Sequence, residues 1–163
     1  MTEDARLRID PATPADVPLI LDLILELAEY EKEPDSAQAT AEQIHEALFG
    51  ARPAAEAVIA RFDGEPAGWA LWFQNFSTWT GKPGLWLEDL FVRPQYRRRG
   101  IGKAVLVYLA RLCLERDYGR FEWSVLDWNE PSLEFYRSLG AEAMSEWTTH
   151  RVTGDALRRL AGM

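Results

Sequence analysis

Apolar residues follow two different periods along this chain, and these periods predict its helices and strands. Apolar positions recur at helical spacing over 14–32 and again over 101–116, which predicts two long helices. Another helix should begin after Thr40, because Thr40 and Gln43 have the pattern of a capping box, and it should end near Gly50. Short apolar or alternating runs predict strands at 7–10, 57–62, 66–76, 85–92, 120–126, 143–147 and 148–152.

Two shorter helices and one tight turn complete the predicted elements. The helices are expected at 131–139, where Asn129 can cap the first turn, and at 155–161. The turn falls at Asp63-Gly64, between two predicted strands. Antiparallel hairpins followed by strand, helix and strand indicate an α/β fold, with one mixed sheet flanked by helices. Because no repeat or linker interrupts the pattern, we expect a single domain over 1–163.

The stretch from Leu87 to Gly102 contains the most informative motif. It leads from an apolar strand through a Gly-rich arginine cluster into a long helix. A helix start presents unpaired N–H groups and the positive end of the helix dipole, and glycine lets an anion approach the backbone. Gly100 and Gly102 supply that access, and residues 97–99 are all arginine. The motif predicts a pyrophosphate site; the alternative is a basic, solvated helix start.

Two common phosphate-binding motifs do not fit this stretch. A P-loop requires glycine where Arg97 stands and Ser or Thr where Ala104 stands, and a dinucleotide fingerprint requires Gly or Ala in place of Val105. The pattern that fits is Arg/Gln-x-x-Gly-x-Gly, filled by Arg97, Gly100 and Gly102. The segment therefore resembles the coenzyme A loop of the GNAT N-acetyltransferases.

Other segments extend this resemblance over most of the chain. The stretches that resemble the diamine (spermidine/spermine-type) branch of the family, in the same order, are 13–16, 26–31, 87–89 and 128–136. The similarity runs from about Ile9 to Ala161, with one departure: the branch usually has glycine at the position of Arg98. The resemblance implies a GNAT-like fold with a mixed, mostly antiparallel central sheet flanked by helices.

The resemblance also implies acetyl-coenzyme A as co-substrate, with no metal. Its pyrophosphate is expected on the loop and helix start formed by Arg97, Arg98, Arg99, Gly100, Ile101, Gly102 and Lys103. Its pantetheine amides are expected to pair with an open strand edge, as a peptide does, along the backbone of Leu90, Phe91 and Val92. The remaining coenzyme contacts are expected from Asn129, Ser132 and Tyr136.

Acetyl transfer to an amine requires that the amine lose a proton and that the departing thiolate gain one. By resemblance, Glu88 contacts the amine and guides its proton away, and Tyr136 is the general acid, because a phenol stays protonated at neutral pH. Tyr30 and Glu31 resemble an acceptor-binding loop, so the acceptor is expected among Tyr30, Glu31, Glu88 and Asp89. Glu88 and Asp89, as successive strand positions, should point to opposite faces. Chemistry alone leaves a solvated Glu88 and a packing role for Tyr136 open.

Composition narrows the classes of partner. A net charge of −8 argues against nucleic-acid binding and favours a cationic small molecule. No apolar run approaches membrane length, and residues 1–6 lack the pattern of a signal peptide, so we expect a cytoplasmic protein without membrane contact. The single cysteine, Cys113, falls on the apolar side of its helix and should be a packing residue. His45 and His150 are far apart, so no metal site is expected.

The leading hypothesis is an N-acetyltransferase that moves an acetyl group from acetyl-coenzyme A to a primary amine of a small cationic acceptor. The acceptor is expected to be a polyamine, a diamine or a lysine-like amine such as thialysine, attacking the thioester directly. Two alternatives remain: a protein or peptide N-acetyltransferase, and a non-catalytic module that senses acyl-coenzyme A. The sensing module would keep the loop but would not need Glu88 or Tyr136. A homodimer is implied by the family resemblance.

Overall fold

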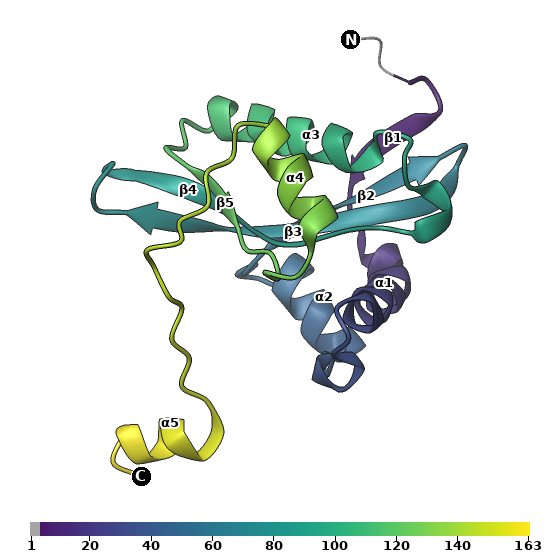
Figure 1. Ribbon diagram of the computed structural model, residues 1–163. Coiled ribbons are helices and arrows are strands. Elements are labelled where there is room, and N and C mark those ends of the chain that lie inside the picture. The colour runs from purple at the N-terminus through teal and green to yellow at the C-terminus, as the bar shows by residue number, and fades with distance from the viewer. Residues whose placement is uncertain (1–3) are drawn as a thin grey trace. The chain divides into compact units, whose positions relative to one another are not determined.

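The computed structural model describes residues 4–163 (Figure 1). Residues 1–3 lie outside the described residues. The expectation that the chain starts without a signal peptide concerns this segment in part. The chain forms two compact units, one ending at Ser124 and the other running from Val125 to Met163.

The first unit is built around a five-stranded sheet in the order β1-β2-β3-β4-β5 (Figure 1). The strands are β1 Leu7–Pro11, β2 Glu56–Phe62, β3 Glu65–Ser77, β4 Lys82–Val92 and β5 Phe121–Trp123. Each of the first three strands pairs antiparallel with the next, and β5 is parallel to β4. The predicted mixed, mostly antiparallel sheet is therefore confirmed.

Sharp turns follow from residues that tolerate a left-handed backbone. The predicted turn between β2 and β3 is confirmed, with φ of 51° at Asp63 and 81° at Gly64. Two successive positive φ values are the geometry of a type I′ turn, whose twist matches that of the two strands it joins. The expected strands up to residue 92 therefore form in their predicted order.

Helices cover both faces of this sheet (Figure 1). The helices of the first unit are α1 Val17–Tyr30, α2 Ala41–Phe49 and α3 Ile101–Glu115, with short 3-10 turns η1 Pro14–Asp16, η2 Pro34–Ser36 and η3 Pro94–Tyr96. α1 and α2 lie on one face and α3 lies on the other. The predicted capping box of α2 is confirmed: the backbone N–H of Gln43 donates to Thr40 Oγ1 at 3.2 Å, and Gln43 Oε1 accepts from the backbone N–H of Thr40 at 3.0 Å.

Two apolar layers hold the helices to the sheet. On the face of α1 and α2, the core consists of Ile20, Leu23, Leu48, Ala57, Ile59, Trp69 and Phe91. On the other face, α3 buries Ile101, Val105, Leu106, Leu109 and Cys113. Each large buried side chain contributes about 1.5–3 kcal/mol to folding. The packing role of Cys113 is thus confirmed, and burial raises the pKa of its thiol.

The second unit contains α4 Glu130–Ser138 and α5 Gly154–Leu160, as expected from the sequence. The prediction of two strands at 143–147 and 148–152 is wrong, because the described residues between α4 and α5 form no strand. Met144 and Trp147 are 62% and 70% exposed, so their apolar character does not bury them here. A strand needs a neighbour for its backbone N–H and C=O groups, and β-forming residues alone do not provide one.

Candidate functional site

The centre of the candidate site is a β-bulge in β4. Leu71 of β3 pairs with Asp89, but the next residue, Trp72, pairs with Leu87, so Glu88 is an extra residue on β4. A bulge interrupts the ladder, bends the strand and changes the direction of side chains. The expected simple alternation between Glu88 and Asp89 assumed a regular strand, and the ladder is not regular at this point.

β4 also parts from its other neighbour at this point. The parallel ladder joins only Leu85–Leu87 of β4 to Phe121–Trp123 of β5. β4 continues to Val92, and among the described residues its last part pairs in the sheet with β3 alone. Every second backbone group of that part therefore faces away from β3. This is the strand edge on which the sequence predicts a peptide-like ligand beside Leu90, Phe91 and Val92.

Three acidic side chains lie close enough to repel one another. Burial, together with the negative charges of Glu88 and Glu31, raises the pKa of Asp89 to about 6. Burial also raises the pKa of Glu31, again with help from Glu88. Glu31 directly follows α1 and the other two residues belong to β4, so the fold brings together acidic groups from distant segments. We call Glu31, Glu88 and Asp89 the carboxylate cluster.

The carboxylate cluster contains three of the four residues that the sequence predicts for the acceptor. Like charges in a partly buried site are unfavourable, and a cation among them relieves both their repulsion and their desolvation. Among the described residues, no grouping of three His, Cys, Asp or Glu side chains has the arrangement of a metal site. The negative charge of the carboxylate cluster suits a cationic ligand.

One neighbour of the carboxylate cluster was missed by the sequence reasoning. The indole Nε1 of Trp86 donates to Oε2 of Glu88 at 2.9 Å. Trp86 is not among the residues that the sequence predicted for this site. The signal that could have found it is the Trp-x-Glu spacing, which places two strand side chains on the same face. The bond fixes the carboxylate of Glu88 next to the bulge.

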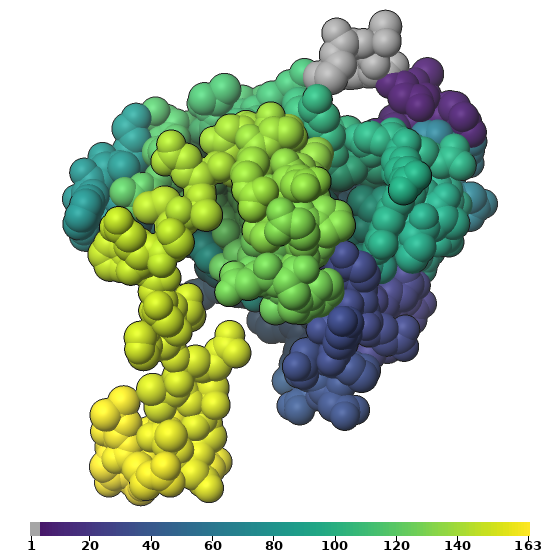
Figure 2. All heavy atoms as spheres, in the orientation of Figure 1, coloured from purple at the N-terminus to yellow at the C-terminus, as the bar shows by residue number. Residues whose placement is uncertain are grey.

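The fourth acceptor residue, Tyr30, contacts the arginine loop. The guanidinium carbon of Arg97 lies 4.8 Å from the centroid of the Tyr30 ring and 5.8 Å from that of Phe91. Arg97 Nε also donates to the carbonyl oxygen of Val92 at 3.1 Å. In Figure 2, the green-teal loop before α3 lies at the surface, next to the blue-violet end of α1.

The loop has the backbone geometry of an anion site. Arg98 and Gly100 have φ of 64° and 73°, and α3 begins directly afterwards at Ile101. Left-handed residues within a turn direct successive N–H groups into a concave nest, which adds to the helix dipole. A Cβ built on Gly102 would have Val92 Cγ2, at 3.9 Å, as its nearest neighbour, so the backbone there is open. These residues fit a pyrophosphate.

The departure from the family pattern at Arg98 has a structural consequence. Its φ of 64° is a conformation that glycine adopts freely and other residues adopt at a cost of about 1–2 kcal/mol. The fold retains the loop geometry with arginine there, so it carries that strain.

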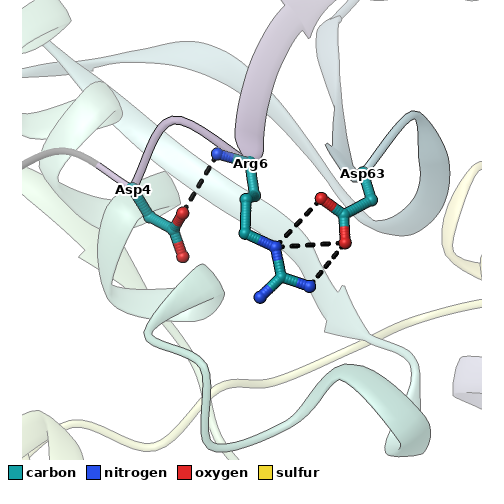
Figure 3. Close-up of polar contacts among 3 residues, drawn as sticks. All are labelled: Asp4, Arg6 and Asp63. Carbon is teal, nitrogen blue, oxygen red and sulfur yellow. Dashed lines mark hydrogen bonds and ion pairs between the residues drawn. The ribbon is translucent and has the colours of Figure 1, made fainter.

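The third arginine of the loop packs on the β2–β3 hairpin. The guanidinium carbon of Arg99 lies 5.0 Å from the centroid of the Phe62 ring, and that of Arg6 lies 4.4 Å from the same ring. Arg6 Nε donates to both carboxylate oxygens of Asp63, at 2.9 and 3.1 Å (Figure 3). The hydrogen bond from Arg6 is the main reason why the pKa of Asp63 lies below its ordinary value, and Arg99 adds to this effect. The hairpin thus holds Arg99 in place.

The predicted coenzyme residues of the second unit share one face of α4. Asn129, Ser132 and Tyr136 are spaced by three and four positions, which puts them on one side of a helix. Asn129 occupies the predicted N-cap position, but its side chain makes no capping hydrogen bond, which corrects the expected capping role. Its φ of −84° and ψ of 68° differ from the extended backbone of an ordinary N-cap. Asn129 is buried, at 8% exposure.

Residues 20–141 match the model of the acetyltransferase (GNAT) family. The thialysine N-epsilon-acetyltransferase of Sus scrofa is 36% identical over 97% of this chain and 99% of its own length. The L-ornithine N5-acetyltransferase of Arabidopsis thaliana is 30% identical over 94% of this chain and 87% of its own length. Among solved structures, an integron cassette protein from the mobile metagenome of V. cholerae superposes with a TM-score of 0.81 at 22% identity, covering 98% of this chain and all of that one.

These similarities extend over most of the chain and agree with the geometry of the first unit. No helix within residues 4–163 is both long enough and apolar enough to cross a membrane. The solved structure supports the fold, and the two relatives support the family and its diamine-type branch, as the sequence predicted. This chain belongs to the GNAT family of acetyltransferases.

Proposed function

We propose that this protein transfers the acetyl group of acetyl-coenzyme A to a primary amine of a small molecule that carries a second cationic group. The carboxylate cluster is the observation that carries the proposal, since it provides more negative charge than one reacting amine needs. The names of the two relatives support it, because thialysine and ornithine are amino acids with a second, side-chain amine.

The first unit supplies the residues that would hold the coenzyme. The N–H groups from Arg98 to Lys103 face the place of a pyrophosphate, and the β4 edge at Leu90–Val92 offers backbone partners for the pantetheine amides. When bound, acetyl-coenzyme A supplies the activated acetyl group. We further propose that Asn129, Ser132 and Tyr136 complete these contacts, so that both units act as one N-acetyltransferase domain over 1–163.

The carboxylate cluster removes the proton that prevents the amine from reacting. A primary amine with a pKa near 10.4 is almost fully protonated at pH 7, so it needs a group that takes up its proton. Glu88, held by Trp86, would orient the amine, and Asp89, with a pKa of about 6, is suited to act as a base near neutral pH. Tyr136 would donate its phenolic proton to the departing sulfur. Glu31 would hold the second cation of the acceptor.

Substrate selection tests this function. Thiol release from acetyl-coenzyme A should be fast with thialysine, ornithine or spermidine, and slow with a monoamine of matched length. Glu31→Gln and Glu88→Gln should each raise the KM for the dications about tenfold or more, because each removes a charge-assisted contact worth about 1.5–3 kcal/mol. Glu29→Gln is the matched control, since Glu29 is exposed on the same helix end and does not contribute to the raised pKa of Asp89.

The same assay separates the alternative functions. A monoamine or a peptide N-terminus that reacts as well as a dication would contradict the two-cation site and favour a peptide N-acetyltransferase. Coenzyme binding without turnover on any amine would favour an acyl-coenzyme A sensor. We also propose a cytoplasmic homodimer that does not bind nucleic acid, which agrees with the net charge of −8.

A further inference from the structure

Arg97 begins the coenzyme loop, yet its side chain points back into the first unit. Its Nε donates to the carbonyl oxygen of Val92 at 3.1 Å, and its guanidinium carbon lies 4.8 Å from the Tyr30 ring centroid. Tyr30 is the last residue of α1 and directly precedes Glu31 of the carboxylate cluster. One side chain therefore joins the coenzyme loop, the exposed edge of β4 and the acceptor end of α1.

The fold does not depend on this contact to place α1. About one turn before the end of the helix, Glu26 accepts hydrogen bonds from Arg93, with Nε at 3.1 Å and Nη2 at 3.0 Å, and Arg93 also donates to the Pro66 carbonyl at 3.2 Å. These groups are partly buried, and α1 buries Ile20 and Leu23 completely. Arg97 therefore acts only on the end of the helix, where the acceptor residues lie.

We propose that Arg97 is a positioning residue that couples the coenzyme site to the acceptor site, so that each ligand binds more tightly when the other is present. This inference rests on the proposed function. Coenzyme binding fixes the backbone of the loop and with it the start of the Arg97 side chain. The guanidinium then holds the Tyr30 ring, and the adjacent Glu31 carboxylate, in the geometry that the acceptor requires.

The size of the coupling follows from the contacts involved. A guanidinium over a tyrosine ring changes an equilibrium constant by about 2- to 30-fold, depending on its exposure. The first ligand to bind orders Arg97 and Tyr30 and bears the loss of their conformational entropy. The second ligand then binds with a smaller entropy cost. Coupling between sites is reciprocal and is commonly about 5- to 150-fold. We expect the low end of that range, because a single side chain carries the link.

Calorimetry on the full chain measures this coupling directly. Thialysine is titrated into the protein with and without saturating coenzyme A, a pair that cannot react, and coenzyme A is titrated with and without thialysine. In the wild type, each ligand should lower the Kd of the other about fivefold, by the same factor in both directions. Arg97→Lys keeps the charge but loses the planar stacking group, and it should remove most of this factor.

Variants of Tyr30 separate coupling from simple coenzyme binding. Tyr30→Leu removes the ring and should lose the same factor as Arg97→Lys, with no further loss in the double variant. Tyr30→Phe keeps the ring and should retain the coupling. Any attraction between the bound cation and the coenzyme phosphates is present in all variants, so only the part carried by the Arg97–Tyr30 contact changes.

The outcomes separate this inference from the proposed function. If the wild type binds neither coenzyme A nor any dication, the proposed function itself is contradicted. Normal binding of both ligands with an unchanged coupling factor in Arg97→Lys and Tyr30→Leu would overturn the inference alone. Additive losses in the double variant would also overturn it. If Arg97→Lys fails to fold, Tyr30→Leu and Tyr30→Phe still test the inference. It requires that Tyr30→Leu lose the coupling and that Tyr30→Phe retain it.

Discussion

Replacing Asp89 with asparagine should stabilise the protein at neutral pH while impairing its activity. Burial and the charges of Glu88 and Glu31 raise the pKa of Asp89 from 3.8 to about 6. In the unfolded chain these influences are absent, so the unfolded pKa should be close to the ordinary value. The difference of about 2 pKa units corresponds to about 3 kcal/mol of destabilisation when Asp89 is ionised in the folded state.

The sign of the pH dependence follows from which state holds the proton. Between about pH 4 and pH 6 the folded protein keeps the Asp89 proton and the unfolded chain has lost it, so raising the pH through this window favours unfolding. The stabilising contribution of protonated Asp89 is complete below pH 3.8 and lost above about 6. Asparagine cannot ionise, so Asp89→Asn should be more stable than the wild type at pH 8 by up to about 3 kcal/mol, and nearly equal to it at pH 4.

Urea unfolding followed by tryptophan fluorescence at pH 4, 6 and 8 measures this difference. Asp22→Asn, which removes an exposed carboxylate on α1, is the control and should change the free energy of unfolding by no more than about 0.5 kcal/mol at any pH. A wild type and an Asp89→Asn variant of equal stability at pH 8 would refute the reasoning. Equal stability would mean that Asp89 is open to solvent and that its carboxylate ionises without cost. A stable variant with poor turnover of dications would show that the cluster is kept for function.

Three further substitutions test the loop and the general acid. Gly102→Asp should fold normally, since a Cβ there has its nearest neighbour at 3.9 Å, and should weaken coenzyme A binding in calorimetry by about 1.4 kcal/mol or more, because it brings a carboxylate to the anion site. Arg98→Gly should be about 1 kcal/mol more stable to urea than Arg98→Ala, since only glycine relieves a φ of 64°; equal stabilities would show that the loop is not strained. Tyr136→Phe should lower single-turnover rates by about 10²-fold with coenzyme affinity unchanged, and wild-type rates would mean that another group protonates the sulfur.

Local pattern predicted the elements whose neighbours are close in sequence. The helix at 101–116 and the hairpin with its Asp63-Gly64 turn formed as expected, because capping, apolar spacing and turn chemistry act over a few residues. The expected strands at 143–147 and 148–152 did not form. Strand formation depends on a partner edge, and no sequence pattern within those segments provides one.

The sequence named the residues of the candidate site but not the geometry that brings them together. The resemblance to the family named Glu31, Glu88 and Asp89 together, although nothing in their spacing requires that they meet. The bulge that makes Glu88 an extra residue depends on the register between β3 and β4, which the sequence does not show. The contact of Arg97 with Tyr30 joins the loop to the end of α1, and only the fold brings these two residues together.

The carboxylate cluster gives a physical reason for an acceptor with two amines. An acceptor with one amine would bind as a cation but would have to give up its charge before attacking the thioester. Once the cluster has taken that proton, the amine is neutral and one carboxylate is protonated, so the two carboxylates that stay ionised would repel each other with no cation between them. A second amine, held by Glu31 as proposed and never required to react, would keep one positive charge in the site throughout the proton transfer. Repulsion within the carboxylate cluster would thus favour acceptors that remain charged while they react.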